Sequence, residues 1–266
     1  MLSRIHLTIM DACGKNVSMN EPKTERNRNP YDVENNVESF HWWFVVRRKL
    51  LRFFLSTLNI PKNSFALDVG CGTGSNLKIL RSGGLKAIGL DRSIYALSLT
   101  QNKITSPLIN ADLNYLPVRP GSIGLIVAMD ILEHLNDDIS GIRSIYQALK
   151  KEGLLILSVP AFRSLWGIQD EVTGHKRRYS RQEMVKKLRQ EGFEIIESSY
   201  FNFFLFVPIF FARQLIRLLG LRIQSENEVN FPIINFFLKT IFSLEVYALR
   251  YFSFPFGVSL LCIAKK

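Results

Sequence analysis

The chain has 266 residues, of which 47% are hydrophobic, and it carries a formal net charge of +11. A chain of this length can bury one full core, so we expect one main domain with additions and not two independent domains. The charge suits nucleic acid, an anionic membrane surface or an acidic substrate as a partner, and it does not choose among them.

The cysteines and the first residues bear on compartment and on metals. Cys13, Cys71 and Cys262 form no CxxC spacing and no disulfide framework, so we predict no metal site and a reducing, cytoplasmic environment. The apolar stretch in residues 1–10 is too short, and too interrupted by charge, for a secretory signal.

The N-terminal part changes character near residue 38. Residues 1–30 are mostly polar and lack the apolar content needed to pack, so we expect a disordered lead. Residues 31–60 are expected to form a helical cover, because aromatic and aliphatic residues then recur at helical spacing as far as Leu58. Arg47 and Arg48 follow the run His-Trp-Trp-Phe, and they are either solvated charges or contacts for a ligand carboxylate.

The stretch from Phe65 to Gly74 reads Phe-Ala-Leu-Asp-Val-Gly-Cys-Gly-Thr-Gly, an apolar strand that feeds a glycine turn. Gly70, Gly72 and Gly74 can adopt backbone angles that other side chains forbid, and they let a ligand approach the main chain. The helix expected to begin at Ser75 offers unpaired N–H groups at its start. Together these features predict a nucleotide-binding site.

Two details argue against a dinucleotide such as NAD at this turn. The NAD fingerprint has glycines at its first, third and sixth positions, whereas here the third glycine stands at the fifth position and Ser75 at the sixth. Asp68 lies two residues before Gly70, where its carboxylate would repel a pyrophosphate. The same charge would attract a ligand that carries an ammonium and a sulfonium.

Strands and helices are expected to alternate after this turn. The expected strands are 86–90, 107–110, 124–129, 154–159 and 193–199, and the expected helices are 94–103, 139–150 and 181–191. This alternation predicts an α/β, Rossmann-like, doubly wound sheet with helices on both faces and ligands beyond the carboxyl ends of its strands. Asp91 stands at such an end and is placed to bind two ribose hydroxyls, or to cap the helix at Ser93.

The motif Leu-Asp-Val-Gly-Cys-Gly-Thr-Gly resembles motif I of the class I S-adenosylmethionine (SAM)-dependent methyltransferases, and the resemblance continues through residues 89–91, 110–112, 130–134 and 153–160. It implies seven strands, mostly parallel, with an antiparallel last strand in residues 257–266. The SAM-binding domain would then comprise residues 61–200 and 257–266. The resemblance implies SAM as the cofactor, held by Asp68, Gly70, Gly72, Gly74, Asp91, Asp112 and Asp130.

Two of these residues keep a second interpretation. The resemblance implies a hydrogen bond from Asp112 to the adenine amino group, but an aspartate here can also cap the turn 113–116. Asp130 could face the methionine ammonium or the acceptor, or it could be structural. His134, in Leu-Glu-His-Leu, is expected to hold its loop in place and not to carry a proton.

The loop 166–180 follows the expected fifth strand, where an acceptor should arrive. Its Gly-His-Lys-Arg-Arg-Tyr run, together with the His-Trp-Trp-Phe segment, resembles a bacterial branch of the same methyltransferases. His175 is the candidate catalytic base, and Arg177, Arg178 and Tyr179 are candidate clamps for an anionic substrate. The alternative is that this run only starts the next helix, with Ser180 as its N-cap.

Residues 201–256 break the alternating pattern, because 13 of the 20 phenylalanines lie there. The segment 203–212 carries no charge, but it is shorter than the roughly 20 apolar residues of a membrane-spanning helix. We therefore expect a hydrophobic helical insertion that lies in a bilayer interface or lines an apolar acceptor pocket. The alternative is a helical subdomain that packs on the sheet edge or on another subunit.

These features predict a cytoplasmic SAM-dependent methyltransferase that acts on a small, hydrophobic or lipid-linked acceptor, with O-methylation favoured, and that touches the inner face of a membrane. A nucleic-acid methyltransferase would explain the charge. However, enzymes that modify base amines carry an Asn/Asp-Pro-Pro-aromatic tetrapeptide where residues 130–133 read Asp-Ile-Leu-Glu. A non-catalytic, membrane-associated SAM-binding protein is the other alternative. The oligomeric state is left open.

Overall fold

The computed structural model describes residues 29–219 and 231–266. The expected disordered lead therefore lies outside the described residues except for its last two. Helix α1 spans Pro30–Val37, and it begins with a proline at its first position and with Asn29 as its cap, whose side chain accepts the Tyr31 N–H at 3.1 Å. Helix α2 spans Trp42–Thr57, in agreement with the expected helix.

Seven strands form one sheet in the order β3-β2-β1-β4-β5-β7-β6. Strand β7 runs antiparallel to both β5 and β6, whereas the other pairs are parallel. This arrangement confirms the predicted seven-stranded, Rossmann-like sheet with an antiparallel last strand. The strands are β1 Phe65–Val69, β2 Lys86–Asp91, β3 Leu108–Asn110, β4 Ile123–Met129, β5 Leu149–Pro160, β6 Glu194–Phe201 and β7 Ser259–Lys265.

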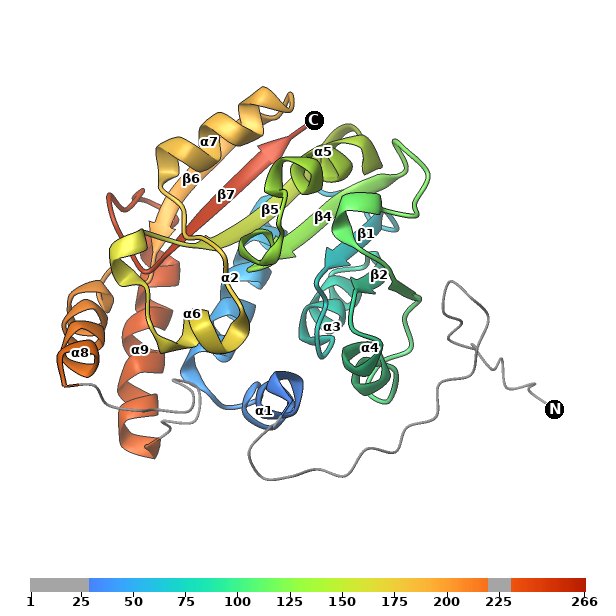
Figure 1. Ribbon diagram of the computed structural model, residues 1–266. Coiled ribbons are helices and arrows are strands. Elements are labelled where there is room, and N and C mark those ends of the chain that lie inside the picture. Colours follow the sequence, from blue (N-terminus) through green and yellow to red (C-terminus); the bar gives the residue numbers. More distant parts are fainter. Residues whose placement is uncertain (1–28, 220–230) are drawn as a thin grey trace.

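Helices cover both faces of the sheet: α5 and α7 lie on one side, and α2, α3 and α4 lie on the other (Figure 1). Three short 3-10 helices interrupt the loops at the carboxyl edge. The helical elements after α2 are α3 Ser75–Ser82, α4 Ile94–Gln101, η1 Leu113–Tyr115, η2 Leu132–His134, α5 Asp138–Ala148, η3 Arg163–Leu165, α6 Ile168–Thr173, α7 Arg181–Gln190, α8 Phe206–Leu218 and α9 Pro232–Ala248.

The insertion between β6 and β7 contributes α8 and α9, and α9 packs along α2 (Figure 1). The ring of Phe242 lies against the rings of Trp42 and Trp43, with centroids 5.9 and 5.8 Å apart. The Asn235 side chain accepts the Trp42 N–H at 2.7 Å. No helix within 29–219 or 231–266 combines the length and the hydrophobicity needed to cross a bilayer.

Candidate functional site

The glycine turn joins β1 to α3 in a conformation that requires glycine. Gly70 and Gly74 have φ values of +70° and +83°, in the left-handed region that other residues rarely adopt. A Cβ on Gly74 would lie 2.6 Å from Thr100 Cγ2, and one on Gly70 would lie 2.8 Å from Ile131 Cδ1. At Gly70 and Gly74 the turn therefore has room for backbone alone.

Asp91 and Asp68 both reach this turn. Both side chains are buried. Asp91 Oδ2 accepts the Gly72 N–H at 2.9 Å, and Oδ1 accepts the Ser93 N–H at 2.8 Å. Asp68 Oδ1 accepts from the Asn76 amide at 3.3 Å, but Oδ2 is buried without a hydrogen-bond partner. The cap of α4 is Ser93 itself, so Asp91 fixes the loop and does not cap that helix directly.

Burial controls the acidity of these carboxyls. Desolvation raises the pKa of Asp68 to about 7, and the nearby Asp91 charge adds to the rise although the Asn76 hydrogen bond opposes it. Desolvation also raises the pKa of Asp91, against the two backbone hydrogen bonds. The carboxyl groups of Asp68 and Asp91 thus lie close together beside the turn, where little water reaches them.

Helix α1 and its C-cap residue Glu38 lie over the glycine turn and make polar contacts there that the sequence did not indicate. Glu38 accepts hydrogen bonds from the hydroxyls of Thr73 and Ser75. A Cβ on Gly72 would lie 3.5 Å from Glu34 Oε1, and the Tyr31 hydroxyl lies 3.5 Å from Asp91 Oδ1.

Desolvation, followed by the Glu38 charge, raises the pKa of Glu34 to about 7. The Asn-Pro pair at residues 29 and 30 was the signal for this helix. The carboxyl side chains beside the glycine turn therefore include Asp68, Asp91 and Glu34, and Glu34 comes from the N-terminal cover.

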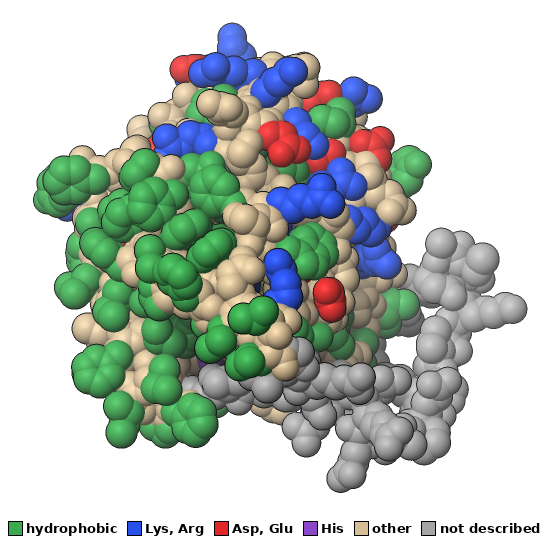
Figure 2. Space-filling model, turned by 60° about the vertical axis from the view of Figure 1, so that its left-hand side comes forward, with side chains coloured by type: hydrophobic (Ala, Val, Ile, Leu, Met, Phe, Trp, Pro, Cys, Tyr) green, Lys and Arg blue, Asp and Glu red, His purple; other side chains and the backbone are tan. Residues whose placement is uncertain are grey.

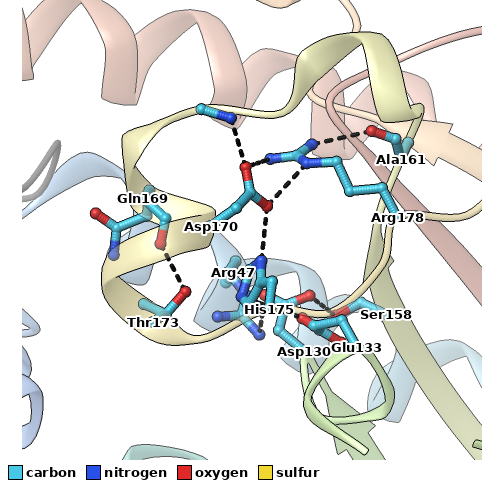
Figure 3. Close-up of polar contacts among 11 residues, drawn as sticks. Arg47, Asp130, Glu133, Ser158, Ala161, Gln169, Asp170, Thr173, His175 and Arg178 are labelled. Carbon is cyan, nitrogen blue, oxygen red and sulfur yellow. Dashed lines mark hydrogen bonds and ion pairs between the residues drawn. The ribbon is translucent and has the colours of Figure 1, made fainter. Parts of the chain in front are cut away.

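The other two predicted aspartates differ in their contacts. Asp130, at the end of β4, has φ +55°, binds Arg47 Nη2 at 3.0 Å and accepts from the Ser158 hydroxyl at 3.0 Å (Figure 3). Asp112 is exposed and accepts the Asn114 N–H at 2.8 Å, so it caps η1 as the alternative interpretation had it. Its contact with adenine stays a prediction.

His175 lies in a cluster of polar side chains beyond the end of β4. Its Nδ1 lies 2.7 Å from Asp170 Oδ1, and its Nε2 lies 3.8 Å from Glu133 Oε1 (Figure 3). The rings of His175 and His134 are 4.8 Å apart at their centroids. Desolvation, reinforced by Asp130, raises the pKa of Glu133 well above its usual range. Desolvation lowers the pKa of His134 to about 4.

Two of the candidate clamps in this loop point into the protein. Arg178 is nearly fully buried and binds both carboxylate oxygens of Asp170 at 2.8 and 2.9 Å. The buried Tyr179 donates to Asp138 Oδ2 at 2.9 Å. Arg177 donates to the carbonyls of Leu135 and Asn136 and is 30% exposed. These contacts show that Arg178 and Tyr179 anchor the loop, which corrects their assignment as substrate clamps.

A surface cavity of about 320 Å³ lies away from these groups, between η1 and α5. None of its lining residues is charged, and none is a predicted site residue. The lining residues are Asn114, Tyr115, Leu116, Val118, Pro120, Ser144, Gln147 and Ala148.

Known proteins with similar sequences include methyltransferases. The demethylmenaquinone methyltransferase of Staphylococcus epidermidis is 28% identical over 151 residues, which cover 52% of this chain and 61% of that protein. The ubiquinone biosynthesis O-methyltransferase of Hydrogenovibrio crunogenus is 27% identical over 149 residues, covering 50% and 61%. The aligned regions thus span about three fifths of these two relatives.

A solved structure supports the fold. The SAM-dependent methyltransferase from Archaeoglobus fulgidus superposes with a TM-score of 0.58 over 90% of this chain and 100% of that one, at 19% identity. The family described as "Methyltransferase domain" matches residues 42–198, which is more than half of the chain and includes the glycine turn, Asp91 and His175. On this match, the chain belongs to the methyltransferase domain family.

Proposed function

We propose that this chain is a SAM-dependent methyltransferase that methylates a small, hydrophobic or lipid-linked acceptor, with an oxygen as the favoured acceptor atom. The observation that carries the cofactor assignment is the unpartnered, buried Asp68 Oδ2 beside the glycine turn. A buried carboxylate oxygen without a donor is costly, and a ligand ammonium would supply the missing hydrogen bond and the opposite charge.

The residues at the turn fit such a cofactor. Asp68 and Glu34 would hold the ammonium, and Asp91 would hold the ribose hydroxyls while it keeps the Gly72 N–H in place. The glycines leave the backbone open to close approach. When bound, SAM supplies a methyl group that is already activated by a sulfonium, so the chain contributes mainly orientation, on the order of 7–11 kcal/mol for well-aligned reactants.

His175 is the group proposed to act on the acceptor. A proton on Nδ1, donated to Asp170, leaves Nε2 unprotonated and able to accept a proton from a hydroxyl. A well-placed general base contributes roughly 10²–10⁴-fold. The proposed acceptor class is supported by the quinone-related names of the two sequence relatives and by the exposed apolar surface of the insertion.

Binding of S-adenosylhomocysteine, the product form of the cofactor, is expected to release roughly one proton at pH 6.5. Because the raised pKa values of Asp68 and Glu34 lie near 7, both carboxyls are partly protonated at pH 6.5 when no ligand is bound. The protonated carboxyls stabilise the folded state, and this stabilisation is lost as pH rises through 7. The ligand ammonium favours the ionised forms, so affinity should increase from pH 6 to pH 8. Titration calorimetry in buffers of different ionisation enthalpy measures the release.

The matched control is Glu245→Gln. Burial also raises the pKa of Glu245 to about 7, but this side chain accepts the N–H groups of Phe203 and Phe204 in the insertion. The control should keep the full proton release. A folded protein that does not bind the ligand, or that binds it with the same affinity at pH 6 and pH 8, would contradict the cofactor assignment.

The insertion carries an exposed apolar surface, visible over α8 and α9 in Figure 2. Monomeric soluble proteins rarely expose large apolar patches unless they are interaction sites. Its most exposed large side chains include Phe211, Leu218, Ile233, Tyr247, Tyr251 and Phe252. We propose that this surface lies on an anionic bilayer. Arg217 and Arg250 are exposed in the insertion, whereas Glu245, the one acidic residue in its described part, is buried.

The double variant Ile233→Ser/Phe237→Ser is expected to lose most co-sedimentation with anionic phosphatidylglycerol vesicles. Both side chains are more than half exposed, so the fold should persist. Tyr115→Ser, which removes an 82% exposed ring outside the insertion, should sediment like the parent chain. Equal sedimentation of all three proteins, or dimer formation without vesicle binding, would overturn the membrane assignment.

A further inference from the structure

Glu133, His134 and His175 bring three potential metal ligands together at the carboxyl edge of the sheet. One side-chain donor atom from each residue lies within 4.8 Å of the other two. Glu133 and His134 belong to η2 after β4, and His175 follows α6, so two segments about 40 residues apart converge on one point.

The carboxylate of Glu133 has no hydrogen-bond partner in the described chain. The side chain is fully buried, and both its oxygens lack a donor within hydrogen-bond distance. The two nearby guanidinium groups each form an ion pair with a carboxylate other than Glu133. Arg47 lies 3.0 Å from Asp130, and Arg178 lies 2.8 Å from Asp170. A buried carboxyl of this kind loses its proton readily only when a cation offsets the lost hydration of the carboxylate, and a bound metal ion would supply that charge.

The surroundings of His175 match those of a metal ligand. Its Nδ1 is engaged by Asp170, which leaves Nε2 directed toward Glu133 (Figure 3). Histidines that bind a metal commonly donate their other N–H to a carboxylate, which fixes the tautomer and the ring orientation. Asp170 is itself held by Arg178 and by the Gly167 N–H at 2.7 Å, so the arrangement is rigid.

We propose that Glu133, His134 and His175 bind a divalent transition-metal ion such as Zn²⁺ or Mn²⁺. Two imidazoles and one carboxylate suit these ions, and three protein ligands leave a coordination position open, as in catalytic sites. Donor atoms around a tetrahedral ion lie about 3.4 Å apart, so the three side chains must close in by small rotations. The prediction of no metal relied on cysteine spacing, which does not test histidine and glutamate ligands.

The ion's place in the reaction rests on the proposed function. The cluster adjoins Asp130, at the end of the sheet where the acceptor is expected, so the open position would take an acceptor oxygen. With an ion bound, Nε2 of His175 is a ligand and does not accept the proton. The ion would then lower the pKa of the hydroxyl, and the hydroxyl proton would pass to solvent water instead of to His175.

Metal binding by the full chain tests the site without any activity measurement. After treatment with a chelator, the protein is titrated with Zn²⁺, Mn²⁺ and Co²⁺ alone, and Co²⁺ binding is followed by its visible absorption. We expect one equivalent of ion to bind, and Glu133→Gln and His175→Ala each to weaken binding at least a hundredfold. Glu245→Gln is the matched control, because Glu245 is also fully buried with one unpartnered oxygen, and it should bind like the parent chain.

Circular dichroism shows whether each variant is folded. If His175→Ala does not fold, Glu133→Gln still tests the site, because glutamine has nearly the same shape as glutamate. Failure of the parent chain to bind these ions, or equal binding by Glu133→Gln, would overturn the metal site. S-adenosylhomocysteine binding is measured on the same samples. Loss of metal binding alone refutes this inference, whereas loss of S-adenosylhomocysteine binding alone refutes the proposed function.

Discussion

Replacing Asp91 with alanine is expected to weaken S-adenosylhomocysteine binding by roughly 10²–10⁴-fold. The buried carboxylate accepts the N–H groups of Gly72 and Ser93, so its loss removes the acceptor that fixes the glycine turn against β2. Hydrogen bonds to a charged group contribute about 1.5–3 kcal/mol each, so the loss of the two proposed bonds from the ribose hydroxyls to Asp91 would account for that loss of affinity. Titration calorimetry measures the affinity, and thermal unfolding followed by circular dichroism reports the accompanying loss of stability.

Two variants separate this effect from a general loss of structure. Asp91→Asn keeps one acceptor oxygen and should give an intermediate affinity. Asp137→Ala removes the side chain that caps α5 by accepting the Ser140 N–H at 3.0 Å, in an exposed position. That change should lower stability by about 1 kcal/mol and leave the affinity unchanged. An Asp91→Ala protein that binds within threefold of the parent would show that the carboxylate has no part in the site.

The glycine turn was predictable because its chemistry is local. The apolar strand, the glycines at fixed spacing and the aspartate at the end of the next strand all reflect backbone conformation within about 25 residues of sequence. The alternation of strands and helices is similarly visible, since each element carries its own hydrophobic period. The sequence did not indicate every boundary between a helix and the next strand. Residues 149 and 150 were assigned to a helix, but they begin β5, because Leu149 pairs with Ile123 of β4.

The contacts that were missed are long-range and polar. Helix α1 has no apolar stripe, and Glu38 contacts Thr73 and Ser75, which lie more than 30 residues away. The approach of His175 to Glu133 likewise depends on a loop crossing the end of β4, which no spacing rule encodes. Hydrophobic periodicity indicates which elements pack, but it does not indicate which buried charges meet.

The N-terminal cover and the insertion are linked through α2. Trp43 lies on Phe242 of α9, and Arg47, one turn further along α2, binds Asp130 at the candidate site. Glu34 in the preceding helix lies over Gly72. A change in α9, for example on a bilayer, therefore has a continuous packed route to the residues around the site. If the apolar surface lies on a bilayer as proposed, this connection would link membrane attachment to the site where the acceptor is expected.

Replacing Asp170 with alanine is expected to lower the free energy of unfolding by about 3–5 kcal/mol, because it removes the carboxylate that binds the buried guanidinium of Arg178 through two hydrogen bonds. Asp170 is fully buried and Arg178 is 3% exposed. The hydrogen bonds from His175 and Arg178 outweigh the desolvation of Asp170 and hold its pKa at about 2, so the pair is charged at neutral pH. Denaturant unfolding of Asp170→Ala, Arg178→Met and the double variant measures the effect.

The double variant should be more stable than Asp170→Ala alone, because it removes the buried charge as well as its partner. Glu191→Ala is the surface control. It breaks an equally short, two-bond contact with Arg143, but that guanidinium is 57% exposed, so solvent replaces the lost partner and little stability should be lost. If Asp170→Ala were no more destabilising than Glu191→Ala, burial would not be what makes the Asp170–Arg178 pair important. The loop that holds His175 would then depend on its backbone contacts with Asp170 and Glu133 instead.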